Sequence, residues 1–179
     1  EDFAQATSRM PTRKYESRGG PGLADLARII RRESTELVDD RLALADFIII
    51  NLVAGAPDGH AKNISLLREP GYTALAPLYD LASGLAYAST RVDRSVALSI
   101  GGERVPSRIR RRQWQKAADS LALDPHLLCR RVEALAEGYP GAFEAVLARL
   151  PAGTPGVAEI ADRALPELSR HSGIVLDGL

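Results

Sequence analysis

The chain has 179 residues, which is enough for one domain with a hydrophobic core of its own. Hydrophobic residues make up 45% and charged residues 26%, the balance of a globular protein rather than of a disordered one. The formal net charge is zero, which argues against a protein that binds nucleic acid through bulk positive charge.

The start of the chain and its cysteine content bear on where the protein works. The sequence begins Glu1-Asp2-Phe3 without an initiator methionine, so we expect a fragment from which an N-terminal part is missing. The single cysteine, Cys129, excludes an internal disulfide and is typical of the reducing cytoplasm. The apolar run at 47–53 is too short to span a bilayer, so we expect no membrane partner.

Helical spacing of apolar residues dominates the first third of the chain. We expect a short helix at 2–7 and a longer one from Leu23. A third helix, with Ser34 or Thr35 as its cap, should run to about Ala54. Because it is apolar nearly all round at its end, it should be the buried central helix.

Short strands are expected after the central helix. Residues 64–68 and 73–78 are separated by Glu69-Pro70-Gly71-Tyr72, which is a hairpin signal. The alternation at 96–100, just before two glycines, predicts a third strand. The remainder should be helical, over 107–121, 125–137, 141–150 and 157–170.

The predicted fold class is therefore mainly α with a small β-hairpin. The expected core residues are Leu26, Ile30, Leu42, Ile49, Leu52, Leu66, Leu78, Trp114, Leu128, Val132 and Leu147.

Two segments raise the question of phosphate binding. The stretch 8–22 should be irregular and ends in Arg18-Gly19-Gly20-Pro21-Gly22. It matches neither known glycine-rich phosphate motif and follows no strand, which favours a turn. The second segment is the densest positive cluster, Arg108, Arg110, Arg111 and Arg112. A solvated helix N-terminus is its usual meaning, and a phosphate or partner contact is the alternative.

The segment that carries chemistry is Gly55 to Asn63, which reads G-A-P-D-G-H-A-K-N. Its glycines and proline break regular structure, so it should be a tight loop between two buried elements; we call it the 55–63 loop. Four hydrogen-bonding side chains lie within six positions of it, namely Asp58, His60, Lys62 and Asn63. A further acid, Asp80, follows the predicted hairpin.

This arrangement matches the needs of phosphoryl transfer, which are a base for the hydroxyl proton, oxygen ligands for Mg²⁺ and positive charge on the phosphates. Asp58 is the candidate base, and Asn63, five residues later, is a candidate magnesium ligand at the spacing of the protein-kinase catalytic loop. Asp80 fits the second metal-binding acid. Lys62 could neutralise phosphate charge or the base, and His60 could bond the loop backbone or touch the acid. Taken singly, each of these residues is more often a turn former.

The motifs Asp58-Gly59-His60-Ala61-Lys62-Asn63-Ile64-Ser65 and Leu75-Ala76-Pro77-Leu78-Tyr79-Asp80 closely resemble the HipA family of bacterial toxin serine/threonine kinases. The early segment with Lys14-Tyr15-Glu16-Ser17 and Gly19-Gly20-Pro21-Gly22 resembles it too. The resemblance extends from Glu1 to at least Val132 and identifies the chain as the C-terminal lobe of a kinase of this type, with the N-terminal lobe absent.

The resemblance implies a role for each matching residue. Asp58 becomes the catalytic base, and Asn63 and Asp80 hold magnesium. We assign Lys62 and His60 to the catalytic and ATP-binding groups. The implied cofactors are ATP and Mg²⁺. The implied substrate is a serine or threonine of a protein, which in known members of the family is an aminoacyl-tRNA synthetase. The implied outcome in the cell is growth arrest and persistence.

The resemblance also implies partners and leaves alternatives. A small HipB-like DNA-binding antitoxin should neutralise the toxin, so that DNA is met only through that antitoxin. One alternative is a non-catalytic lobe retained for binding a partner. Another is a small-molecule kinase of the aminoglycoside-phosphotransferase type, which also spaces Asp and Asn by five but which the segment from Lys14 to Gly22 disfavours. The upstream phosphate-covering loop and nucleotide-binding lysine are missing, so we expect the fragment alone to be inactive.

Overall fold

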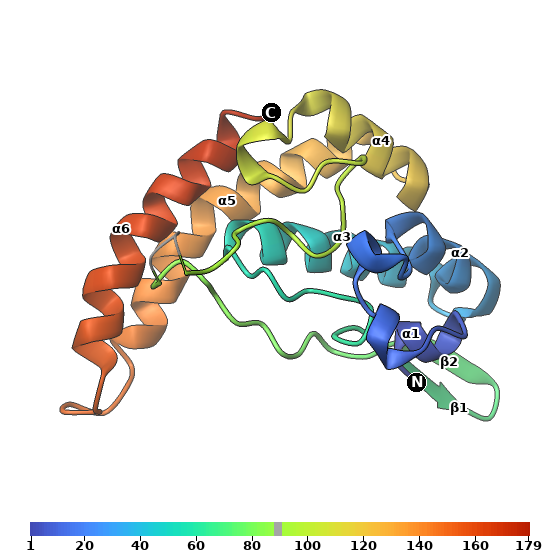
Figure 1. Cartoon of the computed structure of the whole chain (residues 1–179), viewed down its shortest axis with the longest axis horizontal. Coiled ribbons are helices and arrows are strands. Elements are labelled where there is room, and N and C mark those ends of the chain that lie inside the picture. Colours follow the sequence, from blue (N-terminus) through green and yellow to red (C-terminus); the bar gives the residue numbers. More distant parts are fainter. Residues whose placement is uncertain (88–90) are drawn as a thin grey trace.

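The structure, a computed structural model, describes residues 1–87 and 91–179. Its regular elements are α1 (Phe3–Ala6), η1 (Pro11–Arg13), η2 (Glu16–Arg18), α2 (Leu23–Glu33), α3 (Leu37–Val53), β1 (Leu66–Glu69), β2 (Tyr72–Leu75), η3 (Pro106–Arg108), α4 (Arg111–Leu121), α5 (Pro125–Leu147) and α6 (Val157–Leu176). The fold is therefore mainly helical with one two-stranded hairpin, as predicted. Figure 1 shows α5 and α6 side by side along one edge and the hairpin at the opposite end, near the N-terminus.

Helix α3 lies at the centre of this arrangement. It contacts α2, α4, α5, α6 and β2 (Figure 1), and most of its side chains beyond Ala43 are buried. The predicted central helix is thus confirmed, although it begins later than expected, after Glu36. Ser34 still stabilises its start, because its hydroxyl accepts a hydrogen bond from the backbone N–H of Glu36 (2.9 Å) and donates one to the buried carboxylate of Asp40 (2.6 Å).

The hairpin brings distant residues back to the 55–63 loop. Strands β1 and β2 pair antiparallel from Leu66 opposite Leu75 to Glu69 opposite Tyr72. Gly71 in the turn has a positive φ of 77°, which suits glycine. Beyond β2 the pairing continues in one bond, from the N–H of Ala76 to the carbonyl of Ser65 (2.8 Å). The segment that leads to Asp80 therefore leaves the hairpin beside the end of the loop.

The third predicted strand is wrong. Within the described ranges, residues 96–100 form no strand and contribute only an isolated bridge between Ile100 and Glu103. The backbone N–H of Ser99 donates to the Glu16 carboxylate instead of to a neighbouring strand. The apolar alternation reflects burial of Val96 and Leu98 in the core, not membership of a sheet.

The helical second half differs from the prediction in its boundaries. The stretches expected at 125–137 and 141–150 form one continuous helix, α5, with Pro140 inside it. Packing of α5 against α6 outweighs the hydrogen bond that the proline removes. Helix α6 likewise continues past Arg170 to Leu176, and the buried ring of His171 bonds the carbonyl of Leu52 in α3 through Nε2 (2.7 Å).

Most of the predicted core residues are buried, with three corrections. Leu78 is 41% exposed because β2 ends at Leu75, so Leu78 lies in an irregular surface segment. Leu42 is half-buried because it precedes the enclosed half of α3. Leu147 is half-buried because it lies at the last turn of α5, among exposed residues.

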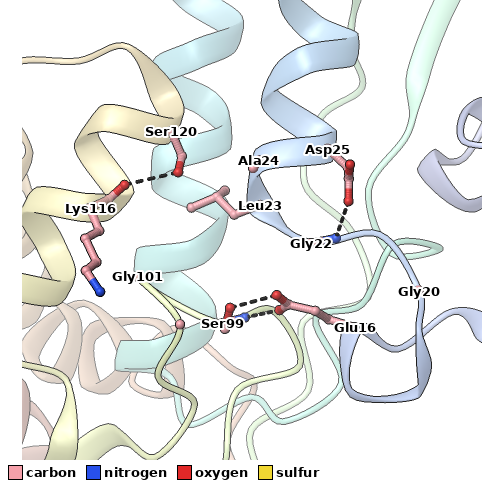
Figure 2. A pocket seen from close by; sticks show the side chains of 11 residues that line it. Glu16, Gly20, Gly22, Leu23, Ala24, Asp25, Ser99, Gly101, Lys116 and Ser120 are labelled. Atoms are coloured by element: carbon pink, nitrogen blue, oxygen red, sulfur yellow. Dashed lines mark hydrogen bonds between the residues drawn. The ribbon is translucent and has the colours of Figure 1, made fainter.

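The glycine-rich segment at 19–22 is a turn, as the sequence favoured. Its N–H groups are taken internally, because Gly19 donates to the carbonyl of Glu16 (3.0 Å), Gly20 to that of Tyr15 (2.9 Å) and Gly22 to the side chain of Asp25 (3.1 Å). No backbone donor is left in it for a phosphate group. Figure 2 shows this turn above the pair formed by Glu16 and Ser99, at the edge of a hollow of about 400 Å³.

Two surface features complete the fold. The arginine cluster lies around the start of α4, and Arg108, Arg110, Arg111 and Arg112 are all exposed, in keeping with a solvated helix end. Among the described residues, no helix combines the length and the apolar character that crossing a membrane requires.

An ion cluster ties the segment after Asp80 to α6. Arg94 donates to the carboxylate of Glu167 (2.7 Å) and to the carbonyl of Tyr87 (2.9 Å). Arg170 donates to the same carboxylate (2.8 Å). These bonds, first from Arg170 and then from Arg94, lower the pKa of Glu167 from its ordinary 4.5 to about 2. Because the folded state holds the carboxylate ionised, the cluster stabilises the fold at neutral pH.

We predict that Glu167→Gln lowers the free energy of unfolding at pH 7 by about 1 kcal/mol, the range of partly exposed ion pairs. The difference from wild type should shrink as the pH falls below 4.5 toward 2, where the unfolded and then the folded carboxylate take up protons. Urea unfolding between pH 7 and pH 3 measures this. Glu159→Gln, which breaks an exposed pair with Arg163 in the same helix, is the control and should change little. A difference that grows on acidification would contradict the assignment.

Candidate active site

The 55–63 loop is held against the end of α3 by close backbone approach. A Cβ on Gly59 would lie 2.6 Å from the amide carbon of Asn51, and one on Gly55, whose φ is +57°, would lie 2.5 Å from Leu85. Both glycines are therefore required by contact rather than by chance turn composition. The loop also bonds itself, because the side-chain amide of Asn63 donates to the backbone carbonyl of Asp58 (2.9 Å). The two candidate residues five positions apart are thus fixed to each other.

The Asp58 carboxylate lies at the surface of the loop, with 51% of the side chain exposed. The hydroxyl of Tyr15 donates a hydrogen bond to its Oδ1. His60 Nε2 lies 3.6 Å from the same oxygen, slightly beyond hydrogen-bond distance. Within the described chain, both neighbours of the carboxylate thus meet Oδ1, and Oδ2 has no protein partner.

His60 is buried beneath Asp58, and its environment keeps it neutral. Desolvation is the largest influence and lowers the pKa of the imidazole, against the opposing charges of Asp58 and Asp80. Its Nδ1 accepts a hydrogen bond from the backbone N–H of Lys62 (3.3 Å), which assigns the proton to Nε2. The Nε2–H group, buried and otherwise unpartnered, therefore faces the carboxylate. The edge of the Tyr15 ring packs on the imidazole, with centroids 4.9 Å apart.

Lys62 reaches away from Asp58. Its amine bonds the carboxylate of Asp2 (2.7 Å), which connects the loop to the N-cap of α1. Burial alone would raise the pKa of Asp2, but hydrogen bonds from Lys62 and from the Gln5 backbone outweigh burial, so that this pKa is lowered. The structure therefore shows Lys62 as an anchor of the loop, while its predicted role toward phosphate remains a prediction.

Asn63 and Asp80 are the predicted magnesium ligands. Asn63 is buried, and its NH₂ group is used by the bond to Asp58, which leaves the carbonyl oxygen as the atom for a ligand. Asp80 is exposed and has a positive φ of 56°, one of three such non-glycine residues in the described ranges. Such strain is often found at functional sites. Tyr79, next to it, bonds the carbonyl of Lys62 (2.8 Å) and the hydroxyl of Ser65 (2.6 Å).

The chemical types of these two side chains suit magnesium bound together with phosphate. Across residues 1–87 and 91–179 no three His, Cys, Asp or Glu side chains gather at one point, so there is no all-protein metal cage. Mg²⁺ typically uses one or two protein ligands plus water and substrate phosphates. One amide oxygen and one exposed carboxylate fit that pattern.

A groove of about 560 Å³ opens beside Asp58. Tyr15 and Asp58 line it together with three arginines, Arg18, Arg91 and Arg104. The half-exposed carboxylate thus borders a hollow at the surface.

Comparisons with known proteins identify the family to which the chain belongs. The family model of the HipA-like C-terminal domain matches residues 1–143, most of the chain. The chain belongs to the HipA-like C-terminal domain family. The protein Y4mE of Sinorhizobium fredii, named as a kinase, is 36% identical over 147 residues, which are 82% of this chain and 34% of that protein.

Two further relatives come from Shewanella oneidensis. The serine/threonine-protein kinase toxin HipA is 30% identical over 108 residues, 60% of this chain and 24% of the toxin. A solved complex of HipA, HipB and its operator DNA matches with a TM-score of 0.83 at 23% identity, covering 98% of this chain and 45% of that one. This HipA-like chain therefore has the fold of that region and spans less than half the length of the relatives.

The structure adds residues to the candidate site that sequence reasoning did not assign. Tyr15 and Asp2 lie 43 and 60 positions from their partners, Asp58 and Lys62, so no local pattern pairs them. The segment that contains Tyr15 carried part of the family resemblance, which was the available signal.

We predict that Gly59→Ala lowers the free energy of unfolding by about 1–3 kcal/mol, because the new methyl group displaces the Asn51 side chain. Chemical denaturation measures the change. Gly138→Ala is the matched control, because a Cβ there meets nothing within 4 Å and it lies inside α5. That change should stabilise by about 0.5–1 kcal/mol. Equal stability of the two variants would show that Gly59 is not required by contact.

Proposed function

We propose that this chain is the catalytic C-terminal lobe of a HipA-like serine/threonine-protein kinase that transfers the γ-phosphate of ATP to a protein. The observation that carries the proposal is the geometry of Asp58. Its Oδ1 is held by Tyr15, its Oδ2 has no partner among the described residues, and the carboxylate borders a groove open to a substrate. Membership of the HipA-like family and the kinase names of the relatives support this chemistry.

Asp58 acts as the base in this proposal. A substrate hydroxyl placed at Oδ2 gives its proton to the carboxylate while the hydroxyl oxygen forms a bond to the γ-phosphorus. The bond between that phosphorus and the bridging oxygen of ADP breaks. His60, neutral and protonated at Nε2, supports the carboxylate from below and carries no competing charge.

Asn63 and Asp80 would hold Mg²⁺ through their side-chain oxygens, and the ion would neutralise charge on the phosphates. His60 and Lys62 remain proposed as parts of the ATP site. The bond between Asn63 and the Asp58 carbonyl supports this assignment, because it fixes the ligand relative to the base.

The proposed partners follow from the relatives. The solved neighbour contains HipB and operator DNA, which supports a HipB-like antitoxin as partner and DNA contact only through it. The proposed substrate is a protein, and we take it to be an aminoacyl-tRNA synthetase, as in known family members. The proposed outcome is toxicity that leads to persistence.

We predict that Asp58 and Asp80 fail differently in the full-length protein. Asp58→Asn removes the proton acceptor and should lower kcat by on the order of 10²–10⁴ with little effect on ATP affinity. Asp80→Ala removes a magnesium ligand and should weaken both activity and magnesium-dependent ATP binding, with Asn63→Ala intermediate. Calorimetric ATP titration at fixed magnesium separates them. Loss of ATP binding in Asp58→Asn, with binding and activity intact in Asp80→Ala, would reverse the assigned roles. A fully active Asp58→Asn would rule out Asp58 as the base.

We also predict that residues 1–179 alone show no measurable kinase activity. Positioning and a water-excluded site supply most of the rate in phosphoryl transfer, and here Asp58 and Asp80 are open to solvent. The measurement is magnesium-dependent ATP turnover, with Asp80→Ala as the background control. Robust turnover abolished by that substitution would mean that this chain holds a complete nucleotide site.

A further inference from the structure

The segment Lys14–Gly22, which we call the tyrosine segment, has a distinctive sequence, but the proposed chemistry uses only the bond from Tyr15 to Asp58. Its glycine turn folds back on the residues before it. Gly20 donates its N–H to the carbonyl of Tyr15 (2.9 Å), and a Cβ on Gly20 would lie 2.6 Å from that oxygen. Only glycine therefore fits there, and the turn fixes the backbone of Tyr15.

Glu16 holds the tyrosine segment to the rest of the lobe. Its carboxylate accepts bonds from both the backbone N–H and the hydroxyl of Ser99 (2.8 Å for the hydroxyl), as Figure 2 shows. On its other side, a Cβ on Gly22 would lie 2.7 Å from the same carboxylate. Glu16, the residue next to Tyr15, is thus confined between Ser99 and the start of α2.

The tyrosine segment meets the 55–63 loop at three places. The carbonyl of Lys14 accepts the N–H of Ala61 (3.4 Å), the ring edge of Tyr15 packs on His60, and the Tyr15 hydroxyl donates to Asp58 Oδ1. That last bond is the main reason why the pKa of Tyr15 is raised, so the phenol stays protonated and remains a donor at neutral pH.

We infer that Tyr15 is a positioning residue for Asp58, and that the tyrosine segment serves to place its hydroxyl. This inference rests on the proposed function. By occupying Oδ1, the phenol fixes the rotation of the carboxylate and leaves Oδ2 as the oxygen that receives the substrate proton. The Tyr15 side chain also lines the groove beside Asp58, so it stands where a substrate hydroxyl would approach.

The test is a double-mutant cycle in the full-length protein, in which steady-state transfer of labelled γ-phosphate gives kcat and KM for each variant. Tyr15→Phe keeps the ring on His60 and removes only the hydroxyl. It should lower kcat about 10-fold and change KM for ATP less than about 2-fold. In the Asp58→Asn background the same change should have no further effect, because a residue that acts through the base loses its role with it.

Two controls accompany the cycle. Tyr72→Phe removes the hydroxyl of an exposed tyrosine in β2 and should leave kcat unchanged. Gly20→Ala displaces the Tyr15 backbone without changing the phenol. It should also lower kcat when residue 58 is aspartate, and should have no effect in the Asp58→Asn variant. Thermal unfolding of each variant reports whether a fall in rate comes from lost folding.

The outcomes separate this inference from the proposed function. An unchanged kcat in Tyr15→Phe, or an equal fall in both backgrounds, would overturn the positioning role while leaving Asp58 as base. Full activity in Asp58→Asn would overturn the proposed function and the positioning role with it. The expected result is that Tyr15→Phe lowers kcat only when residue 58 is aspartate, with the KM for ATP unchanged.

Discussion

The candidate site depends on the close approach of the 55–63 loop to the end of helix α3. A Cβ on Gly59 would overlap the side chain of Asn51 in α3, so a larger residue there would push the loop away from the helix. A Cβ on Gly55 would overlap Leu85, which lies in the segment beyond Asp80. Helix α3 is itself enclosed by four helices and β2, which makes it a rigid support. The position of Asp58 is therefore set by core packing, although its carboxylate faces solvent.

Three other segments then converge on this loop from distant parts of the sequence. The tyrosine segment contributes Tyr15, the N-terminal turn contributes Asp2, and the exit of the hairpin contributes Tyr79. Each makes at least one hydrogen bond to the loop, and two of these bonds are made to charged groups, which strengthens them. The loop is thus held in place from several sides by the protein itself, as the proposed phosphoryl transfer would require.

The electrostatics of the site follow from unequal burial. His60 lies beneath the surface and stays neutral, while Asp58 and Asp80 remain exposed to water. Because the His60 ring is neutral, it lies below the exposed carboxylate of Asp58 without forming an ion pair with it. Farther from the loop, the Arg94–Glu167–Arg170 cluster fixes the segment beyond Asp80 to α6 by ion pairs that hold at neutral pH.

The sequence by itself determined the helical class, the central helix, the hairpin and the family, because these follow from local periodicity, turn residues and a contiguous motif. It also singled out Asp58, Asn63 and Asp80 as site candidates, because their spacing matches that of a kinase catalytic loop. It failed at 96–100, where apolar alternation meant core packing rather than a strand, and at Pro140, where the contact between α5 and α6 outweighed a local helix breaker.

Only the tertiary structure decided that Lys62 bonds Asp2, that Tyr15 bonds Asp58, and that Glu16 is fixed by Ser99. The partners in those pairs lie 43 to 83 positions apart, and such contacts are set by how the helices pack, which no local pattern encodes.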